Sequence, residues 1–216
     1  KELPREVALI GFAGAPWTVA SYMIEGGSSR DFTRAKRWAF GSPETFARLF
    51  DLIVQGTIRY LLDQVAAGAE TLQLFDSWSG VWPEPAFRKW CLAPAAAIAA
   101  GVRREHPRIP LIYFPRGAGA MLPAAAGTGW SALGLDTTVP LGWAREVLPG
   151  SLPLQGNLDP QILVVGGRAL DDEVDRILSA MNGRPFIFNL GHGIDKDTPP
   201  EHVTQLMELV RRGGQP

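Results

Sequence analysis

The sequence predicts an α/β fold with a parallel sheet, because short apolar runs alternate with helical stretches along the whole chain. Each run is bounded by Gly, Pro or Asp, which is typical of strands buried on both faces. The 216 residues, 46% of them hydrophobic, are enough for one domain with a sizeable core, and we expect residues 1–216 to form a single domain. Six strands are predicted, at 7–11, 71–75, 110–114, 132–135, 152–155 and 186–189.

A tight turn and a helix are predicted directly after the first strand. Gly11, Gly14 and Pro16 mark the turn. The fixed φ of Pro16 suits the first position of a helix. Tyr22 follows on this helix, so its phenol hydroxyl is expected near the strand-to-helix turn.

Three further helices are predicted from apolar periodicity and from their end signals. The clearest covers residues 43–67, where Ser42 is expected to cap the helix and Gly68 to end it. Another covers about residues 171–181. The last begins at the sequence Thr-Pro-Pro-Glu, residues 198–201, which matches a capping box.

Composition excludes several classes of function. The net charge of −1 gives no global basic field for nucleic acid or an anionic membrane. No apolar run approaches the roughly 20 residues that span a bilayer. The chain opens on charged residues and a proline, so we expect no signal peptide. Cys91 is the only cysteine, which excludes an internal disulfide, and a reducing cytoplasmic location is therefore expected.

Polar residues follow every predicted strand, and function in parallel α/β folds lies at the carboxyl ends of the strands. We expect these side chains to gather at one edge of the sheet. In chain order they are Gly14 and Tyr22; Asp76, Ser77 and Ser79; Arg116; Asp136; Gln155, Asn157 and Asp159; and Asn189 with His192.

Most of these residues also have an ordinary structural explanation. Tyr22 could be a core tyrosine with its hydroxyl at the rim, and Arg116 a paired or solvated surface residue. Ser77 could cap a turn, which is about as plausible as a ligand role. Turn or helix-start chemistry is the better explanation for Asp136, Asn157 and Asp159.

His192 is the exception, because it lies between two glycines directly after a predicted buried strand. Flanking glycines let a ligand approach the backbone closely and leave the imidazole prominent. A functional role is therefore the better explanation for His192. The other histidines, His106 and His202, are expected at the surface.

Five sequence blocks in one order resemble the uroporphyrinogen decarboxylase family. They are residues 11–27 (GFAGAPWTVASYMIEGG), 74–78 (LFDSW), 134–136 (GLD), 154–160 (LQGNLDP) and 189–193 (NLGHG). The resemblance implies a (β/α)8 TIM barrel. Only six strands are predicted here, so an incomplete barrel with the first strands absent is favoured over an open six-stranded sheet.

The resemblance also implies an activity and a set of site residues. The activity is decarboxylation of the acetate arms of uroporphyrinogen to give coproporphyrinogen, by a homodimer that needs no metal or organic cofactor. Tyr22 corresponds to the active-site tyrosine and is expected to position substrate by a hydrogen bond. Ser77 and His192 correspond to substrate contacts, and His192 meets a carboxylate arm. Arg116 is our own addition, a cation at the mouth of the barrel.

The family's main catalytic carboxylate and its arginines lie nearer the N-terminus and have no counterpart in this chain. We therefore expect an N-terminally truncated protein that is inactive when expressed alone. Two alternatives remain open. One is a zinc methyltransferase of the corrinoid-linked relatives, which needs His and Cys ligands although Cys91 is the only cysteine. The other is a non-catalytic module that binds tetrapyrroles.

Overall fold

The computed structural model describes residues 3–4 and 6–213. It divides into two compact units, Lys1–Ala132 and Leu133–Pro216. Within each unit the strands pair in parallel and alternate with helices. The α/β class predicted from the alternation of apolar runs is therefore confirmed.

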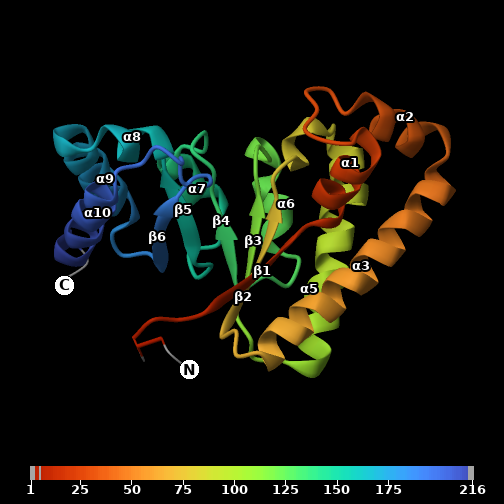
Figure 1. Cartoon of the computed structure of the whole chain (residues 1–216), viewed down its shortest axis with the longest axis horizontal. Coiled ribbons are helices and arrows are strands. Elements are labelled where there is room, and N and C mark those ends of the chain that lie inside the picture. Colours follow the sequence, from red (N-terminus) through yellow and green to blue (C-terminus); the bar gives the residue numbers. More distant parts are fainter. Residues whose placement is uncertain (1–2, 5, 214–216) are drawn as a thin grey trace. The chain divides into compact units, whose positions relative to one another are not determined.

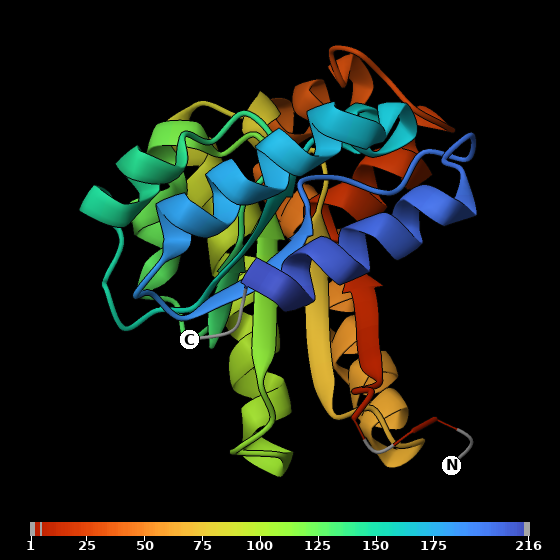
Figure 2. The same cartoon turned by 90° about the vertical axis from the view of Figure 1, so that its left-hand side faces the viewer.

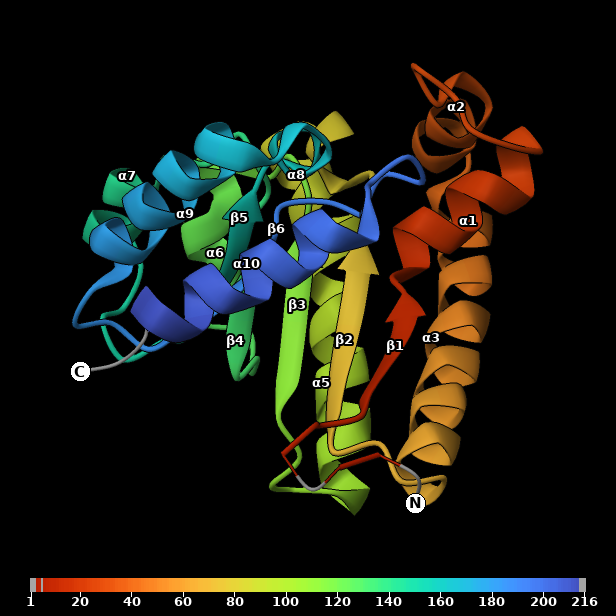
Figure 3. The same ribbon diagram turned by 60° about the vertical axis from the view of Figure 1, so that its left-hand side comes forward.

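The first unit is built on three parallel strands, β1 (Ile10–Gly14), β2 (Thr71–Asp76) and β3 (Leu111–Pro115). The arrowheads of all three point the same way in Figure 3, so their carboxyl ends share one edge. The prediction of 7–11 for the first strand was wrong at both ends. Residues 7–9 are exposed, and the Leu9 N–H donates to the Glu70 carboxylate rather than to a strand backbone.

Helices cover one face of these strands. Figure 1 shows α3 and α5 side by side, and the contact is close enough that a Cβ on Gly101 would overlap the Ile58 side chain. The helical elements of the unit are α1 (Pro16–Glu25), α2 (Thr33–Gly41), α3 (Pro43–Ala66), η1 (Ser79–Val81), α4 (Glu84–Phe87), the π-helical η2 (Arg88–Leu92), α5 (Ala93–Glu105), η3 (Gly119–Met121) and α6 (Leu122–Ala126).

The helix boundaries test the predicted end signals. Pro16 begins α1, as predicted. Gly68, with φ of 110°, follows the last turn of α3 and donates its N–H to the Val65 carbonyl, also as predicted. The Ser42 cap was wrong, because the Ser42 side chain makes no capping hydrogen bond. Its carbonyl instead accepts from the Phe46 N–H and from the Thr45 hydroxyl.

The outer edge of β1 is closed by a side chain. The Gln64 amide of α3 accepts from the Phe12 N–H (2.7 Å) and donates to the Phe12 carbonyl (2.9 Å). Gly11 makes room for this amide, since a Cβ there would lie 2.7 Å from Gln64 Oε1. Gln64 thus satisfies the N–H and the carbonyl of Phe12 on the side of β1 that no described strand pairs.

The second unit contains β4 (Ala132–Gly134), β5 (Leu154–Leu158) and β6 (Phe186–Leu190), paired in parallel in that order. Its helices are α7 (Leu141–Val147), α8 (Pro160–Val165), α9 (Gly167–Met181) and α10 (Pro200–Gly213). Figure 2 shows α9 and α10 running alongside each other. Burial on both faces was predicted for all six strands, but β1 and β6 each expose part of their side chains.

Two predictions about α10 need correction. His202 was expected at the surface and is half-buried: its Nδ1 lies 3.0 Å from the Leu163 carbonyl, and its ring packs where Gly166 has no side chain. The capping box does not form, because the buried Thr198 hydroxyl has no hydrogen-bond partner. Contacts between helices, rather than a local cap, therefore hold the start of α10.

Among the described helices, none is both long enough and apolar enough to cross a bilayer.

Replacing Gln64 by Met should destabilise the protein by about 1 kcal/mol and promote aggregation, because both Phe12 backbone groups lose their partner. Gln64→Glu should have an intermediate effect, since it keeps the acceptor and loses the donor. Urea denaturation and light scattering measure the two effects. Gln55→Met, at an exposed glutamine of the same helix, is the control. Equal behaviour of the two Met variants would contradict the edge role of Gln64.

Candidate active site

Three of the four predicted site residues lie at the carboxyl ends of β1, β2 and β3. Tyr22 is on α1, the helix that follows β1, and its side chain is exposed. Ser77 directly follows β2 and Arg116 directly follows β3, and both are half-buried. The first unit therefore brings these three to the same edge of its strands, as predicted for a parallel sheet.

Trp78 joins two of these residues. The Tyr22 ring meets the indole edge-on at 6.3 Å between centroids, and the Arg116 guanidinium lies 5.9 Å from the indole centroid. The Trp17 indole N–H donates to the Trp78 carbonyl (2.9 Å), and the Phe32 ring packs at 5.4 Å. A cation over an aromatic face is attracted by the ring quadrupole, so the Trp78 indole contacts both the Arg116 guanidinium and the Tyr22 ring.

Three phenyl rings, one from each of β1, β2 and β3, form a row across the strands. Phe12 and Phe75 lie 5.9 Å apart, and so do Phe75 and Phe114. The register places all three on one face, since Phe12 pairs with Gln73, and Phe75 with Phe114. Phe12 is 59% exposed and Phe75 is half-buried, whereas Phe114 is buried, so the row offers apolar surface at β1 and β2.

Backbone hydrogen bonds join the loops after β2 and β3. The Arg116 N–H donates to the Asp76 carbonyl (3.1 Å), and the Arg116 carbonyl accepts from Ser79 Oγ (2.9 Å) and from the Gly80 N–H (3.1 Å). Gly80 has no room for a Cβ, because the backbone of Gly117 lies against it. Ser79 is therefore a structural residue that fixes the backbone of Arg116.

Asp76 points to the opposite face of β2, toward the helices, and is fully buried. Its carboxylate accepts from Thr18 Oγ1 (2.9 Å) and from the Tyr113 hydroxyl (3.1 Å), and the Cys91 thiol also contacts it. Burial raises the pKa of Asp76 to about 6, although these three donors oppose the shift. Burial and the neighbouring Asp76 charge also raise the pKa of Cys91 and of Tyr113.

The fourth predicted residue, His192, lies in the second unit, in the loop after β6, and is exposed. Gly191 before it is buried against Thr137 and Asn157 and has no space for a Cβ. The turn that presents His192 is therefore fixed by its glycine. Convergence of His192 with Tyr22 and Ser77 stays a prediction.

Other polar residues of the second unit have the structural roles that were the better explanation. Asp136 accepts from the backbone and side chain of Thr138. The Asn157 amide donates to the carbonyls of Asp136 and Val139. Asp159 caps α8 by accepting from the Gln161 N–H. These residues shape the strand ends.

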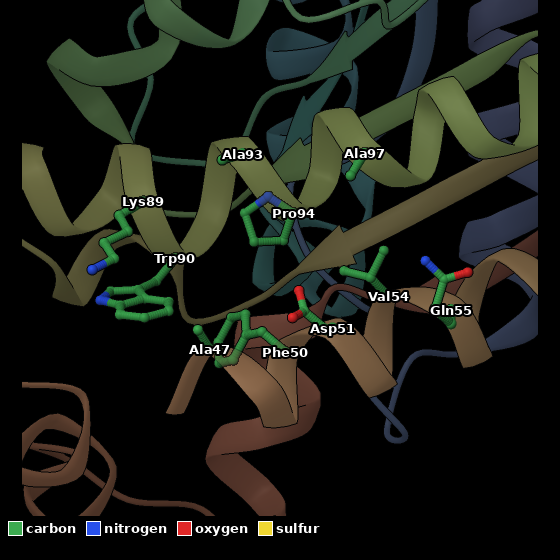
Figure 4. A pocket seen from close by; sticks show the side chains of 10 residues that line it. All are labelled: Ala47, Phe50, Asp51, Val54, Gln55, Lys89, Trp90, Ala93, Pro94 and Ala97. Carbon is green, nitrogen blue, oxygen red and sulfur yellow. The ribbon is translucent and has the colours of Figure 1, made fainter. Parts of the chain in front are cut away.

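A pocket of about 360 Å³ lies between α3 and α5. Figure 4 shows Lys89 and Trp90 at one end of it and Val54 and Gln55 at the other. The described residues that line it include none of the four predicted site residues. Within residues 3–4 and 6–213, no three His, Cys, Asp or Glu side chains are grouped to hold a metal ion.

Sequence reasoning missed the residues that organise this edge. Trp78 and Phe75 lie within a recognised block, yet only the register shows that their neighbours are Arg116 and Phe114. Thr18 was part of a quoted motif with no role assigned to it. Their partners are far apart in sequence, so no local pattern could have paired them.

Comparison with known proteins identifies the family. A model of the uroporphyrinogen decarboxylase (URO-D) family matches residues 1–213. The chain belongs to the uroporphyrinogen decarboxylase family. Its parallel strands and alternating helices are accordingly those of an incomplete (β/α)8 barrel.

Curated uroporphyrinogen decarboxylases are about half identical to this chain. The protein of Rhodospirillum rubrum is 48% identical over 210 residues, which cover 97% of this chain and 60% of the relative. That of Granulibacter bethesdensis is 49% identical over 212 residues, covering 98% and 62%, and that of Sphingopyxis alaskensis is 50% identical over 212 residues with the same coverage. The chain thus spans about 60% of the length of these relatives.

Asp76 should make folding stability depend on pH. Its folded pKa of about 6 is above the ordinary 3.8, so the folded state binds the proton more tightly. The stabilisation is full below about pH 4 and is lost as the pH rises through 6, on the order of 3 kcal/mol in all. Asp76→Asn removes this titration.

Urea denaturation of wild type and Asp76→Asn at about pH 4.5 and 7.5 tests this. The unfolding free energy of Asp76→Asn minus that of the wild type should be about 2 kcal/mol larger at pH 7.5 than at pH 4.5. The neighbouring Cys91 and Tyr113, whose pKa values are also raised, stay protonated over this range. A constant difference would show that Asp76 does not titrate near pH 6.

Proposed function

We propose that the gene product that contains these 216 residues decarboxylates the acetate arms of uroporphyrinogen to give coproporphyrinogen in haem biosynthesis. One observation carries the proposal. In a chain of the uroporphyrinogen decarboxylase family, Tyr22, Ser77 and Arg116 lie at one edge of parallel strands, next to a row of phenyl rings. Hydrogen-bond donors and a cation beside an apolar surface suit a macrocycle with carboxylate arms.

The chemistry requires an electron sink. When the bond between the acetate methylene and its carboxyl group breaks, carbon dioxide leaves and the electron pair stays on the methylene carbon. A protonated pyrrole ring accepts this pair, protonation of the methylene then gives a methyl group, and the ring releases the proton that activated it. The substrate thus supplies its own sink, so we propose that no metal or organic cofactor is needed.

The residues of the first unit are proposed to contact different parts of the substrate. The rings of Phe12 and Phe75 pack against the apolar face of the macrocycle. The Arg116 guanidinium, held over the Trp78 indole, pairs with a carboxylate arm, for which its planar fork is suited. Tyr22 donates a hydrogen bond that positions the reacting ring.

Ser77 and His192 complete the proposed contacts. Ser77 begins the loop directly after β2 and is half-buried, and from there we propose that it contacts an arm of the macrocycle. His192, exposed on its glycine-flanked turn, meets another carboxylate arm. The carboxylate that stabilises the pyrrole cation in the family is not supplied by Asp76, which is buried on the other face of β2.

The remaining features of the proposal follow the family. We propose a cytoplasmic enzyme that acts as a homodimer and whose residues 1–216 belong to one barrel domain. No observation described above favours the zinc methyltransferase. Burial beside Asp76 raises the pKa of the Cys91 thiol and so opposes the thiolate that zinc requires.

The test is to incubate the intact gene product with uroporphyrinogen, with and without a chelator, and to separate the products chromatographically. We expect coproporphyrinogen and partly decarboxylated intermediates, at a rate that the chelator does not change. Binding without turnover would favour the non-catalytic module instead. Loss of activity with the chelator would revive the zinc alternative.

His192→Ala should lower catalytic efficiency by about tenfold to a hundredfold, because a charge-assisted hydrogen bond is worth roughly 1.5–3 kcal/mol. Steady-state kinetics and thermal melting measure the effect. His106→Ala, at a half-buried histidine before β3, is the control. Normal kinetics with a collapsed melting temperature would show that His192 is structural.

Arg116→Gln should raise KM about tenfold and change kcat less, because Arg116 contacts an arm in both the ground and the transition state. Arg116→Lys should recover part of the affinity, as it keeps the charge and loses the planar fork. The control is Arg108→Gln, an exposed arginine near the opposite end of β3. An unchanged KM would remove Arg116 from the site.

A further inference from the structure

Asp76 contacts the segments that carry three of the four proposed site residues, although its own side chain points away from them. It precedes Ser77 in sequence. Its carbonyl accepts from the Arg116 N–H (3.1 Å), and its carboxylate accepts from Thr18 of α1, the helix that carries Tyr22. The single buried residue Asp76 therefore contacts the segments that carry Tyr22, Ser77 and Arg116.

The link to Tyr22 runs through one turn of α1. Thr18 Oγ1 donates to Asp76 Oδ1 at 2.9 Å, and Thr18 is 7% exposed. Residues four apart lie on the same face of a helix. The hydrogen bond from Thr18 to Asp76 therefore limits both sliding of α1 along its axis and rotation about that axis. It thereby positions the turn of α1 that carries Tyr22.

The link to Arg116 runs through β3. The Tyr113 hydroxyl donates to Asp76 Oδ2 at 3.1 Å, three residues before Arg116. The Asp76 carbonyl holds the Arg116 N–H directly. Ser79, just beyond Ser77, holds the Arg116 carbonyl from the other side. The backbone of Arg116 is thereby fixed relative to the β2 strand end.

Burial makes these links rigid. Asp76 and Tyr113 are wholly buried, and Cys91, which also contacts the carboxylate, is 1% exposed. A buried carboxylate that turned away from its donors would leave several buried polar groups without hydrogen-bond partners at once. The carboxylate therefore has one arrangement.

We infer that Asp76 and Thr18 are positioning residues, which hold Tyr22, Ser77 and Arg116 in the relative placement that catalysis needs. The inference rests on the proposed function of those three residues. Neither Asp76 nor Thr18 contacts the substrate. They act through α1 and the loop after β3, so substituting either one should shift the positions of the proposed site residues while leaving those residues present.

The first test compares three threonine variants of the intact gene product. Thr18→Val is nearly isosteric and removes the hydroxyl, Thr18→Ser keeps it, and Thr57→Val is the control at another buried helical threonine of the first unit. Thr18→Val should lower kcat about tenfold or more, as small misplacements do, with KM changed less than about threefold. Thr18→Ser should restore kcat, and Thr57→Val should leave it unchanged.

A second test does not depend on turnover. The chain contains 3 tyrosines, and each samples a different environment: Tyr22 at the site, Tyr113 on the Asp76 carboxylate, and Tyr60 exposed on α3. In protein labelled with 3-fluorotyrosine, Thr18→Val should shift the fluorine resonances of Tyr22 and Tyr113 but not of Tyr60. Each resonance is assigned by Tyr→Phe substitution.

The two readouts separate the possible failures. A wild-type protein without turnover would refute the proposed function, and the Tyr22 resonance would still decide whether Thr18 positions it. An unshifted Tyr22 resonance in Thr18→Val would overturn the inference. So would a kcat equal to that of Thr57→Val when the melting temperatures of both variants fall, because Thr18 would then be merely structural.

Discussion

The parallel register of β1, β2 and β3 is the constraint on which the candidate site depends. Because partners in a parallel pair face the same side, the register that sets Phe75 beside Phe114 also aligns the residues that follow these strands. Asp76 and Ser77 are neighbours in the chain, yet Asp76 ends β2 with its side chain buried toward the helices, whereas Ser77 begins the loop beyond the strand and is half-buried.

Bringing the strand ends together places demands on the backbone. The loops after β2 and β3 approach so closely that Gly80 has no space for a side chain against Gly117. The hydrogen bonds of Ser79 and Arg116 across this contact satisfy groups that would otherwise be buried without partners. A glycine at the point of closest approach, together with hydrogen bonds to the Arg116 backbone, is one solution to the problem of packing two loops at a strand edge.

Much of the fold could be predicted from the sequence because its signals are local. The fixed φ of Pro16 and the left-handed Gly68 act within one turn, and both predictions were right. The Ser42 cap failed although its residue type was correct, because a cap also needs the side chain to face the helix N–H groups. His202 was misjudged because its burial depends on the gap at Gly166, which is distant in sequence.

The distinction between local signals and contacts distant in sequence also explains which parts of the site could be predicted. Arg116 was found because it follows a strand, and Tyr22 because it lies in a recognisable motif. The aromatic and hydrogen-bonded residues that support them stayed hidden, since Thr18 and Asp76 are 58 positions apart and only the fold pairs them. A polar residue at a strand end is therefore ambiguous in sequence: Asp76, the last residue of β2, is buried and holds Thr18 and Tyr113, whereas Ser77, one position later, is half-buried in the loop and is proposed to contact the ligand. The place of each residue relative to the strand end, rather than its type, separates the two.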